Sequence, residues 1–159
     1  IGVGLVGSEM CIRDSWYLDL AMVGKYWGSD RTYHHTAPIN MNYALREALR
    51  LVAEEGLQAR WQRHQETANL FWTGLESIGL SCHVDAEHRL ASLTTVCVPD
   101  GVDAKHIAGR LLQEYNIEIA GGLGELAGKV WRVGLMGFNS RKENVALLLS
   151  ALERGLNER

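Results

Sequence analysis

Hydrophobic side chains recur at helical spacing through the first half of the chain. Residues 16–27 read as a short helix, and residues 41–52 carry apolar side chains at positions i, i+3 and i+4, the spacing that gathers them on one helical face. Gly56 interrupts this second helix. Residues 57–78 continue with a narrow apolar seam on a third helix, and Gly79 is placed as its C-terminal cap. The seam consists of Leu57, Trp61, His64, Ala68, Phe71, Leu75 and Ile78.

The second half of the chain alternates between short strands and helices. Strands are predicted at the short apolar or β-branched runs 80–84, 93–98, 117–119 and 130–136. Asp103 is placed to cap the helix that follows the second strand. Ser140 and Glu143 form a capping box, in which each side chain satisfies a backbone donor of the other residue, and this box opens the last helix. The apolar faces of these two helices comprise Ile107, Leu111, Leu112 and Tyr115, and Val145, Leu148, Leu149, Leu152 and Leu156.

These elements predict an α/β fold in which a helical arm precedes a small domain, with a short, mostly antiparallel sheet covered by helices. With 159 residues, the chain has the size of one domain. Its net charge of -3 gives no basic footprint of the kind that nucleic acids or anionic membranes attract. No apolar run reaches the roughly 20 residues that a membrane helix requires. We therefore expect neither a nucleic acid nor a membrane as a partner.

The cysteines and the first residues bear on the origin of the chain. Cys11, Cys82 and Cys97 are odd in number and widely spaced, which matches neither a disulfide framework nor a zinc site and favours a reducing compartment. The chain does not begin with Met, so we expect it to be part of a longer product. Residues 1–15 lack regular periodicity and resemble a translated sequencing adapter. We interpret them as a non-native extension, with a genuine N-terminal strand as the alternative.

Two hydroxyls and two imidazoles occur together in Tyr33-His34-His35-Thr36, just before Pro38. Next to a helix start, where backbone N–H groups are free, such donors could hold an anion such as phosphate. The alternative is a surface loop in which Thr36 caps the next helix. A metal site on the two histidines is disfavoured, because no third ligand has a suitable local spacing.

Arg132 is the one charged residue in the apolar run at residues 130–135. A charged residue there must face solvent, find a partner or face a ligand. Because a guanidinium binds a carboxylate through two parallel hydrogen bonds, an arginine on a rigid strand suits a carboxylate substrate. A cross-strand ion pair is the alternative. Upstream, Gly121, Gly122 and Gly124 permit close backbone approach, but they lead into a strand and match neither a P-loop nor a dinucleotide motif.

Three other features have structural interpretations. His64 lies on the helical seam as a packed, hydrogen-bonded residue. His83 and His88 surround a polar turn and are expected to be solvated. The mixed charges of residues 54–66 indicate a solvent-facing helix surface.

Several short motifs occur in one order along the chain. They are Tyr33-His34-His35-Thr36-x-Pro38, Leu45-Arg46-Glu47-Ala48-Leu49, Glu54-Glu55-Gly56-Leu57, Ile117-Glu118-Ile119-x-Gly121-Gly122-Leu123-Gly124, Gly128-Lys129-Val130-x-Arg132-Val133-Gly134 and Asn139-Ser140-Arg141-x-Glu143-Asn144-Val145. Over residues 16–157 this series resembles the C-terminal portion of the alanine–glyoxylate (serine–pyruvate) aminotransferases, in the class V group of fold-type-I pyridoxal-phosphate enzymes.

The resemblance implies a domain division and a set of roles. Residues 16–55 would be the end of the large domain with its connecting helix, and residues 56–159 the small C-terminal domain. Tyr33 and Thr36 match residues that reach across a homodimer to the phosphate of pyridoxal 5'-phosphate in the other subunit. Arg132 matches the arginine that binds the α-carboxylate of the amino or keto acid substrate.

The resemblance also implies what this chain lacks. In the family, the lysine that binds the cofactor covalently lies upstream, and Lys25, Lys105, Lys129 and Lys142 do not stand in its motif. No catalytic residue is therefore assigned within this chain. The parent protein is expected to move an amino group from alanine or serine to glyoxylate or pyruvate, and the chain alone is expected to be inactive.

Two further hypotheses remain open. Another class V enzyme, such as an aminoethylphosphonate aminotransferase or a cysteine desulfurase, would share the motifs, although a desulfurase needs a mobile, activated thiol and Cys82 and Cys97 lie in predicted strands. A non-catalytic α/β binding module is the alternative from a different class. Residues 157–159 are not a peroxisomal Ser-Lys-Leu address. The cytoplasm is therefore the expected compartment, with the peroxisome or mitochondrion as alternatives in a eukaryote.

Overall fold

The computed structural model describes residues 16–157, so the predicted extension at residues 1–15 lies outside the described residues. Contacts divide the chain into two compact units between Arg50 and Leu51. This division falls within helix α2 (Ile39–Glu55). The predicted division after residue 55 concerns the domains of a longer parent protein and stays a prediction.

Helix α1, in the first unit, is shorter than the sequence pattern predicted. A 3-10 turn at Trp16–Leu18 comes first, and helix α1 spans Leu20–Trp27. Asp19 separates the two, because its carboxylate accepts hydrogen bonds of 2.9 and 3.0 Å from two N–H groups in the first turn of α1, as an N-cap does. A loop follows, and α2 begins directly after Pro38, as predicted.

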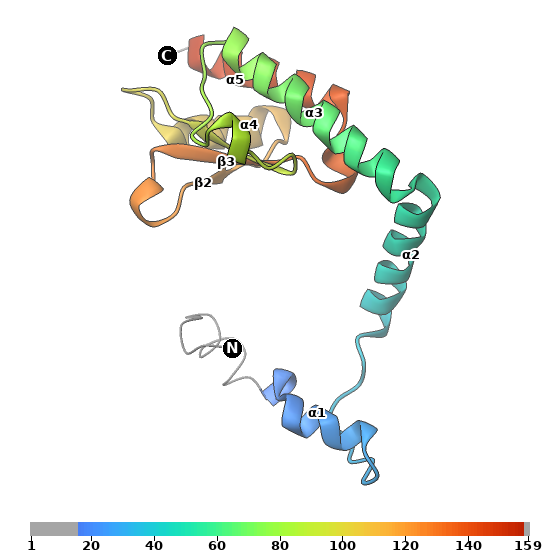
Figure 1. Ribbon diagram of the computed structural model, residues 1–159. Helices are drawn as coiled ribbons and strands as arrows, with labels where there is room; N and C mark the ends of the chain where they lie inside the picture. The colour runs from blue at the N-terminus through green and yellow to red at the C-terminus, as the bar shows by residue number, and fades with distance from the viewer. Residues whose placement is uncertain (1–15, 158–159) are drawn as a thin grey trace. The chain divides into compact units, whose positions relative to one another are not determined.

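The second unit consists of three helices that cover one face of an antiparallel sheet (Figure 1). Helices α3 (Leu57–Ser77) and α5 (Lys142–Asn157) lie side by side, and helix α4 (Ala104–Tyr115) packs against α5. The strands have the order β1-β3-β2, with bounds Leu93–Cys97 for β1, Ala120–Gly121 for β2 and Val130–Gly134 for β3. The predicted α/β fold, with a short antiparallel sheet covered by helices, is confirmed.

The core of this unit lies where the helices meet the sheet. Val96 of β1 and Trp131 of β3 are register partners and both are buried. Trp131 also donates a hydrogen bond of 2.9 Å from Nε1 to the carbonyl oxygen of Ala104, which joins the sheet to α4. Because successive side chains of a strand point to opposite faces, Arg132 faces away from this core. The helices contribute Phe71, Leu75, Ile107, Leu111, Val145, Leu148 and Leu152.

The predicted strand at residues 80–84 is wrong. The structure has a single bridge there, between Cys82 and Val96. Leu80 is held at the end of α3, since its N–H donates to the carbonyl oxygen of Leu75 at 2.9 Å. A 3-10 turn then begins at Ala86, so too few extended residues remain to form a longer ladder with β1.

The predicted strand at residues 117–119 is also wrong, because strand β2 begins at Ala120. Asn116 ends α4 in the left-handed conformation, with φ of 55°, and turns the chain back. The N–H of Ile117 then donates to the carbonyl oxygen of Leu111 at 3.0 Å. Residues 117–119 are therefore tied to α4 before the chain reaches β3.

The predicted capping box at Ser140 and Glu143 is not formed. Helix α5 begins at Lys142, and the buried Ser140 hydroxyl has no hydrogen-bond partner among the described residues. Ser140 is instead held in the preceding turn, because its carbonyl oxygen accepts a hydrogen bond of 2.7 Å from Arg63. Asp103 does cap α4 as predicted, with its carboxylate accepting from two backbone N–H groups.

The predicted apolar faces of the helices are buried over part of their length. Gly79 has the positive φ, 76°, expected of a glycine that ends a helix. Of the α3 seam, Ala68, Phe71 and Leu75 are buried. Leu57 and Trp61, in its first half, are 54% and 58% exposed. Leu112 is 49% exposed, because Leu111 takes the inward position on α4.

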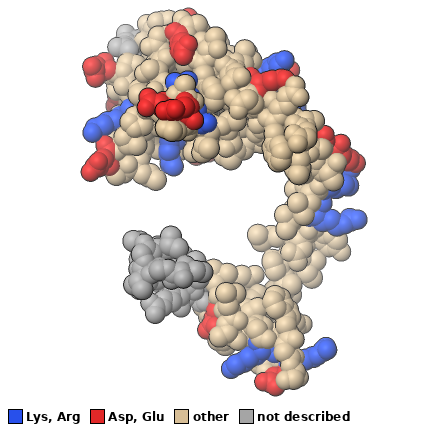
Figure 2. Space-filling model, in the orientation of Figure 1, with Lys and Arg blue, Asp and Glu red and all other residues tan. Residues whose placement is uncertain are grey.

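Charged side chains of both signs are intermixed on the face shown in Figure 2. Neither sign covers a large area of that face. No helix among residues 16–157 has the length and apolar character that a membrane span requires.

Candidate functional site

The loop before α2 brings two hydroxyl groups together. The Tyr33 and Thr36 hydroxyl oxygens lie 2.6 Å apart, and both side chains are exposed. Within the described residues the Thr36 hydroxyl bonds to Tyr33 and not to a backbone N–H of α2, so the alternative in which Thr36 caps the helix does not hold. Two adjacent hydroxyls that can each donate a hydrogen bond are suited to hold one anionic oxygen.

The two histidines between these hydroxyls make aromatic contacts. The ring of Trp16 stacks on His34 and the ring of Tyr17 lies against His35, each with centroids 4.1 Å apart. No group of three or more His, Cys, Asp or Glu side chains suited to a metal ion occurs in the part of the chain that the structure describes. The histidines thus contribute to the shape of the loop that carries Tyr33 and Thr36.

Arg132 lies near the middle of β3, on the face of the sheet opposite the core. Its register partners are Thr95 on β1 and Ala120 on β2. Neither of these residues carries a charge, so the alternative of a cross-strand ion pair does not hold. The Arg132 Nε donates to the carbonyl oxygen of Gly121 at 2.8 Å. Its two terminal nitrogens make no hydrogen bond or ion pair within residues 16–157, and they form the pair of donors that a carboxylate binds bidentately.

The glycine-rich segment next to Arg132 is closely folded. The Gly122 N–H donates to the carbonyl oxygen of Val130 at 3.0 Å, and a 3-10 turn follows at Gly124–Leu126. A Cβ added to Gly122 would lie 2.0 Å from the carbonyl oxygen of Leu126. Position 122 therefore requires glycine because of a close approach of two backbone segments.

The structure therefore pairs the predicted site residues within each unit. Tyr33 and Thr36 lie together in the first unit, and Arg132 lies with the glycine segment in the second. The first pair offers hydrogen-bond donors for a phosphate-like anion, and the arginine offers two parallel donors for a carboxylate.

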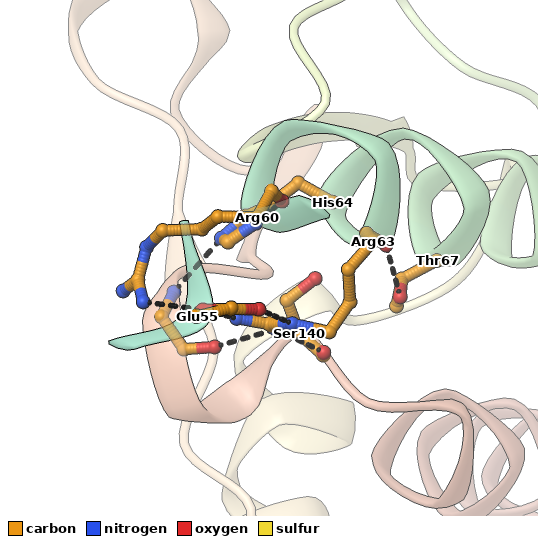
Figure 3. Close-up of polar contacts among 7 residues, drawn as sticks. Glu55, Arg60, Arg63, His64, Thr67 and Ser140 are labelled. Atoms are coloured by element: carbon orange, nitrogen blue, oxygen red, sulfur yellow. Dashed lines mark hydrogen bonds and ion pairs between the residues drawn. The ribbon is translucent and has the colours of Figure 1, made fainter. Parts of the chain in front are cut away.

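A network of polar groups at the start of α3 was not found from the sequence (Figure 3). Glu55 accepts hydrogen bonds from Arg60 at 2.7 Å and from Arg63 at 2.5 and 3.0 Å. Arg63 also donates to the carbonyl oxygens of Gly137 and Ser140 at 3.0 and 2.7 Å. The prediction that residues 54–66 form a solvent-facing surface is wrong for these three side chains, which are only 25–33% exposed.

His64 belongs to the same network, and the prediction of a packed, hydrogen-bonded histidine is confirmed. Its Nε2 accepts a hydrogen bond of 3.0 Å from the N–H of Gly137, and its Nδ1 lies 2.7 Å from the carbonyl oxygen of Arg60. Because Nε2 accepts, Nδ1 carries the proton and donates. The network thus joins α3 to the turn that follows β3. The sequence signal is weak, because Glu55 is separated from Arg60 and Arg63 by the helix break at Gly56.

Two pKa shifts follow from these surroundings. The hydrogen bond from Arg63 is the main cause that lowers the pKa of Glu55 to about 2, so Glu55 stays ionised at neutral pH. Burial raises the pKa of the Cys82 thiol, which is the reverse of what an activated thiol requires. Cys97 is half-buried, and His83 and His88 are exposed, as predicted.

A separate pocket of about 280 Å³ lies in the second unit, between residues 115–119, the end of β3 and α5. Its polar lining includes Glu118, Asn139 and Asn144. None of the predicted site residues lines this pocket.

Comparisons with known proteins give one consistent result. The family model described as Aminotransferase class-V matches residues 16–148. The chain is 44% identical to an alanine–glyoxylate aminotransferase of Callithrix jacchus, over 89% of this chain and 35% of that protein. It is 42% identical to an (S)-ureidoglycine–glyoxylate transaminase of Bacillus subtilis, over 86% of this chain and 33% of that protein.

The solved structures agree. A crystal structure of an alanine–glyoxylate aminotransferase from Nostoc sp. is 68% identical to this chain, with a TM-score of 0.82, and the match covers 90% of this chain and 38% of that one. The chain thus spans about a third of the length of the curated relatives that it matches.

Proposed function

This chain belongs to the class-V aminotransferase family, and from that premise we propose that it is the C-terminal part of a transaminase that moves an amino group from alanine or serine to glyoxylate or pyruvate. Class-V aminotransferases use pyridoxal phosphate, which we propose as the cofactor of the parent protein. The names of the two relatives above share glyoxylate and differ in the amino donor. This supports glyoxylate as an acceptor and leaves the donor to be measured.

Arg132 carries the proposal for the substrates. Amino acids and 2-keto acids share one group, the carboxylate next to the reacting carbon. The terminal nitrogens of Arg132 match such a group in charge and in geometry, and the central position of the arginine on β3 gives it a rigid support. One arginine can therefore hold the amino donor and the keto acid in turn. Glyoxylate has few groups besides its carboxylate that an enzyme can recognise, so the affinity of the enzyme for glyoxylate should depend strongly on Arg132.

Tyr33 and Thr36 support the proposal for the cofactor. Their hydroxyl oxygens, exposed and 2.6 Å apart, fit a phosphate oxygen as hydrogen-bond donors. Bound pyridoxal phosphate supplies the electron-withdrawing ring on which amino groups are exchanged. We assign the two hydroxyls to the cofactor phosphate of a second parent subunit, which makes the parent protein a homodimer. The lysine that binds the cofactor would come from the parent protein, so residues 1–159 alone should show no transamination.

The test uses the full-length protein that contains this chain, with alanine, serine and (S)-ureidoglycine as donors and glyoxylate as acceptor. Replacing Arg132 by Gln removes the positive charge and the bidentate hydrogen bonding to the substrate carboxylate. We therefore expect the KM for glyoxylate to rise at least about 10-fold. Arg110→Gln is the matched control, because Arg110 pairs with Glu114 along α4 and is not a proposed site residue. An unchanged KM in Arg132→Gln would refute the substrate assignment.

The cofactor assignment has its own readout. The double variant Tyr33→Phe, Thr36→Ala should bind pyridoxal phosphate more weakly than the wild type, whereas Tyr43→Phe, which removes an exposed hydroxyl on α2, should not. Equal cofactor affinity in all three proteins would contradict the assignment of the hydroxyls. Turnover by residues 1–159 alone would contradict the proposal that the chain is an incomplete enzyme.

A further inference from the structure

We infer that the glycine turn at residues 121–126 is a positioning element for Arg132, which fixes the guanidinium so that its two terminal nitrogens face the substrate carboxylate. This inference rests on the proposed function, because it requires Arg132 to bind the substrate carboxylate. Three observations on the second unit support it. They concern the carbonyl of Gly121, the packing at Gly122 and the hydrogen bond of Arg132.

The carbonyl of Gly121 is free to accept a side chain because of its place on an edge strand. Among the described residues, β2 pairs only with β3, and the N–H of Gly122 points to β3, since it donates to Val130. The carbonyl of Gly121 and the N–H of Gly122 belong to one trans peptide group and point in opposite directions, so the carbonyl of Gly121 points away from the ladder. The Nε of Arg132 donates to this oxygen at 2.8 Å. The hydrogen bond occupies the inner nitrogen of the guanidinium and leaves both outer nitrogens for a ligand.

The position of the Gly121 carbonyl is set by the close packing at Gly122. The nearest atoms to an added Cβ there are backbone atoms of Leu126, at 2.0 and 2.6 Å, and Cγ2 of Val130, at 2.8 Å. The carbonyl of Leu126 is itself held by the N–H of Lys129 at 3.1 Å. Because the obstacle is backbone and not the end of a flexible side chain, the turn has little room to shift. The absence of a side chain at 122 is thus a condition for the observed hydrogen bond.

Fixing the guanidinium matters because arginine has a long and flexible side chain. Immobilising such a side chain on binding costs affinity, and a group that is already held loses less. The turn should therefore act on substrate affinity and leave the chemical step unchanged. Interactions of equal strength in the ground state and the transition state alter KM and not kcat.

The variant Gly122→Ala tests this in the full-length enzyme. We expect the KM for glyoxylate and for alanine to rise about 3- to 10-fold, with kcat within about 2-fold of the wild type and an unchanged Kd for pyridoxal phosphate. The crystal structure of the variant should show a lengthened distance from Arg132 Nε to the carbonyl of residue 121. Gly109→Ala is the matched control, because this glycine lies within α4 and an added Cβ meets nothing within 4 Å.

The outcomes separate this inference from the proposed function. If Arg132→Gln raises the KM and Gly122→Ala does not, the positioning role is overturned and the substrate assignment stands. If Arg132→Gln leaves the KM unchanged, the proposed substrate assignment is refuted, and the inference that rests on it falls with it. Parallel losses of kcat and cofactor affinity in Gly122→Ala would indicate a general structural role and overturn the inference.

A second variant covers the case in which Gly122→Ala does not fold. Gly124 has φ of 55° with open space around it, so Gly124→Ala strains the same turn without a steric clash. It should raise the KM in the same direction, by a smaller factor. An unchanged KM in this variant would likewise overturn the inference.

Discussion

Arg63 is the residue whose loss should most weaken the junction between α3 and the turn after β3. Arg63→Met keeps most of the aliphatic length of the side chain. It removes the hydrogen bonds to the carbonyl oxygens of Gly137 and Ser140 and also the ion pair with Glu55 (Figure 3). These two carbonyls lie 74 and 77 residues along the chain from Arg63. The variant therefore cuts a contact between distant segments and leaves the helix itself intact.

The magnitude follows from the charge and exposure of Arg63. A buried hydrogen bond from a charged donor contributes about 1.5–3 kcal/mol. Because the side chain is 33% exposed, water replaces part of each bond, and about 1–1.5 kcal/mol for each is a better measure. The two bonds together then contribute about 2–3 kcal/mol. For a chain of this size, 1 kcal/mol corresponds to about 2–4 °C, so the Tm should fall by about 4–12 °C.

Thermal unfolding of residues 1–159, followed by far-UV circular dichroism, measures this shift. Arg60→Met is the matched control, because the Arg60 side chain shares the partner Glu55 and, within the described residues, does not bond to the turn. This variant should stay within about 3 °C of the wild type. Equal shifts for the two variants would refute the reasoning, since the stabilisation would then come from the ion pairs and not from the backbone carbonyls.

Two further predictions concern the same unit. The pKa of Glu55, lowered from 4.5 to about 2, means that its stabilising contribution is complete above pH 4.5 and is lost as the pH falls toward 2. As the pH falls through this window, the free energy of unfolding in urea should therefore decrease less for Glu55→Gln than for the wild type. Identical dependences of this free energy on pH in the two proteins would contradict the lowered pKa. Trp131→Phe removes the bond to Ala104 at a site that is 1% exposed and should cost about 2–4 kcal/mol of unfolding free energy. Leu112→Ala, half-exposed on α4, should cost under about 1 kcal/mol, and similar losses in both variants would count against this placement of the core.

Local rules predicted the helices well and the short strands poorly. The break at Gly56, the cap at Asp103 and the turn at Gly79 were all visible in the sequence, because each depends on neighbours within about four residues. Residues 80–84 and 117–119 have the composition of strands, but strands need a partner in register. Residues 80–84 pair with β1 only around Cys82, because Leu80 is bonded back to α3, and Ile117 is bonded back to α4 and not to a strand.

The same distinction applies to the candidate site. The motif around Arg132 and the pair Tyr33 and Thr36 could be selected from the sequence by family resemblance, and their roles stay predictions. The hydrogen bond from Arg132 to Gly121 could not be predicted, because it depends on the register between β2 and β3. The sequence also suggested a capping role for Ser140, which the contact with Arg63 replaces.

The sequence by itself determined the order of the helices, the α/β class and the family to which the chain belongs. These depend on periodicity, on capping residues and on motifs that lie close together in the chain. Only the tertiary structure decided which side chains meet across long separations, such as Glu55, Arg63 and Ser140, and which nitrogen atoms of Arg132 stay available. The physical reason is that hydrogen bonds act over about 3 Å in space, and folding alone brings distant residues within that range.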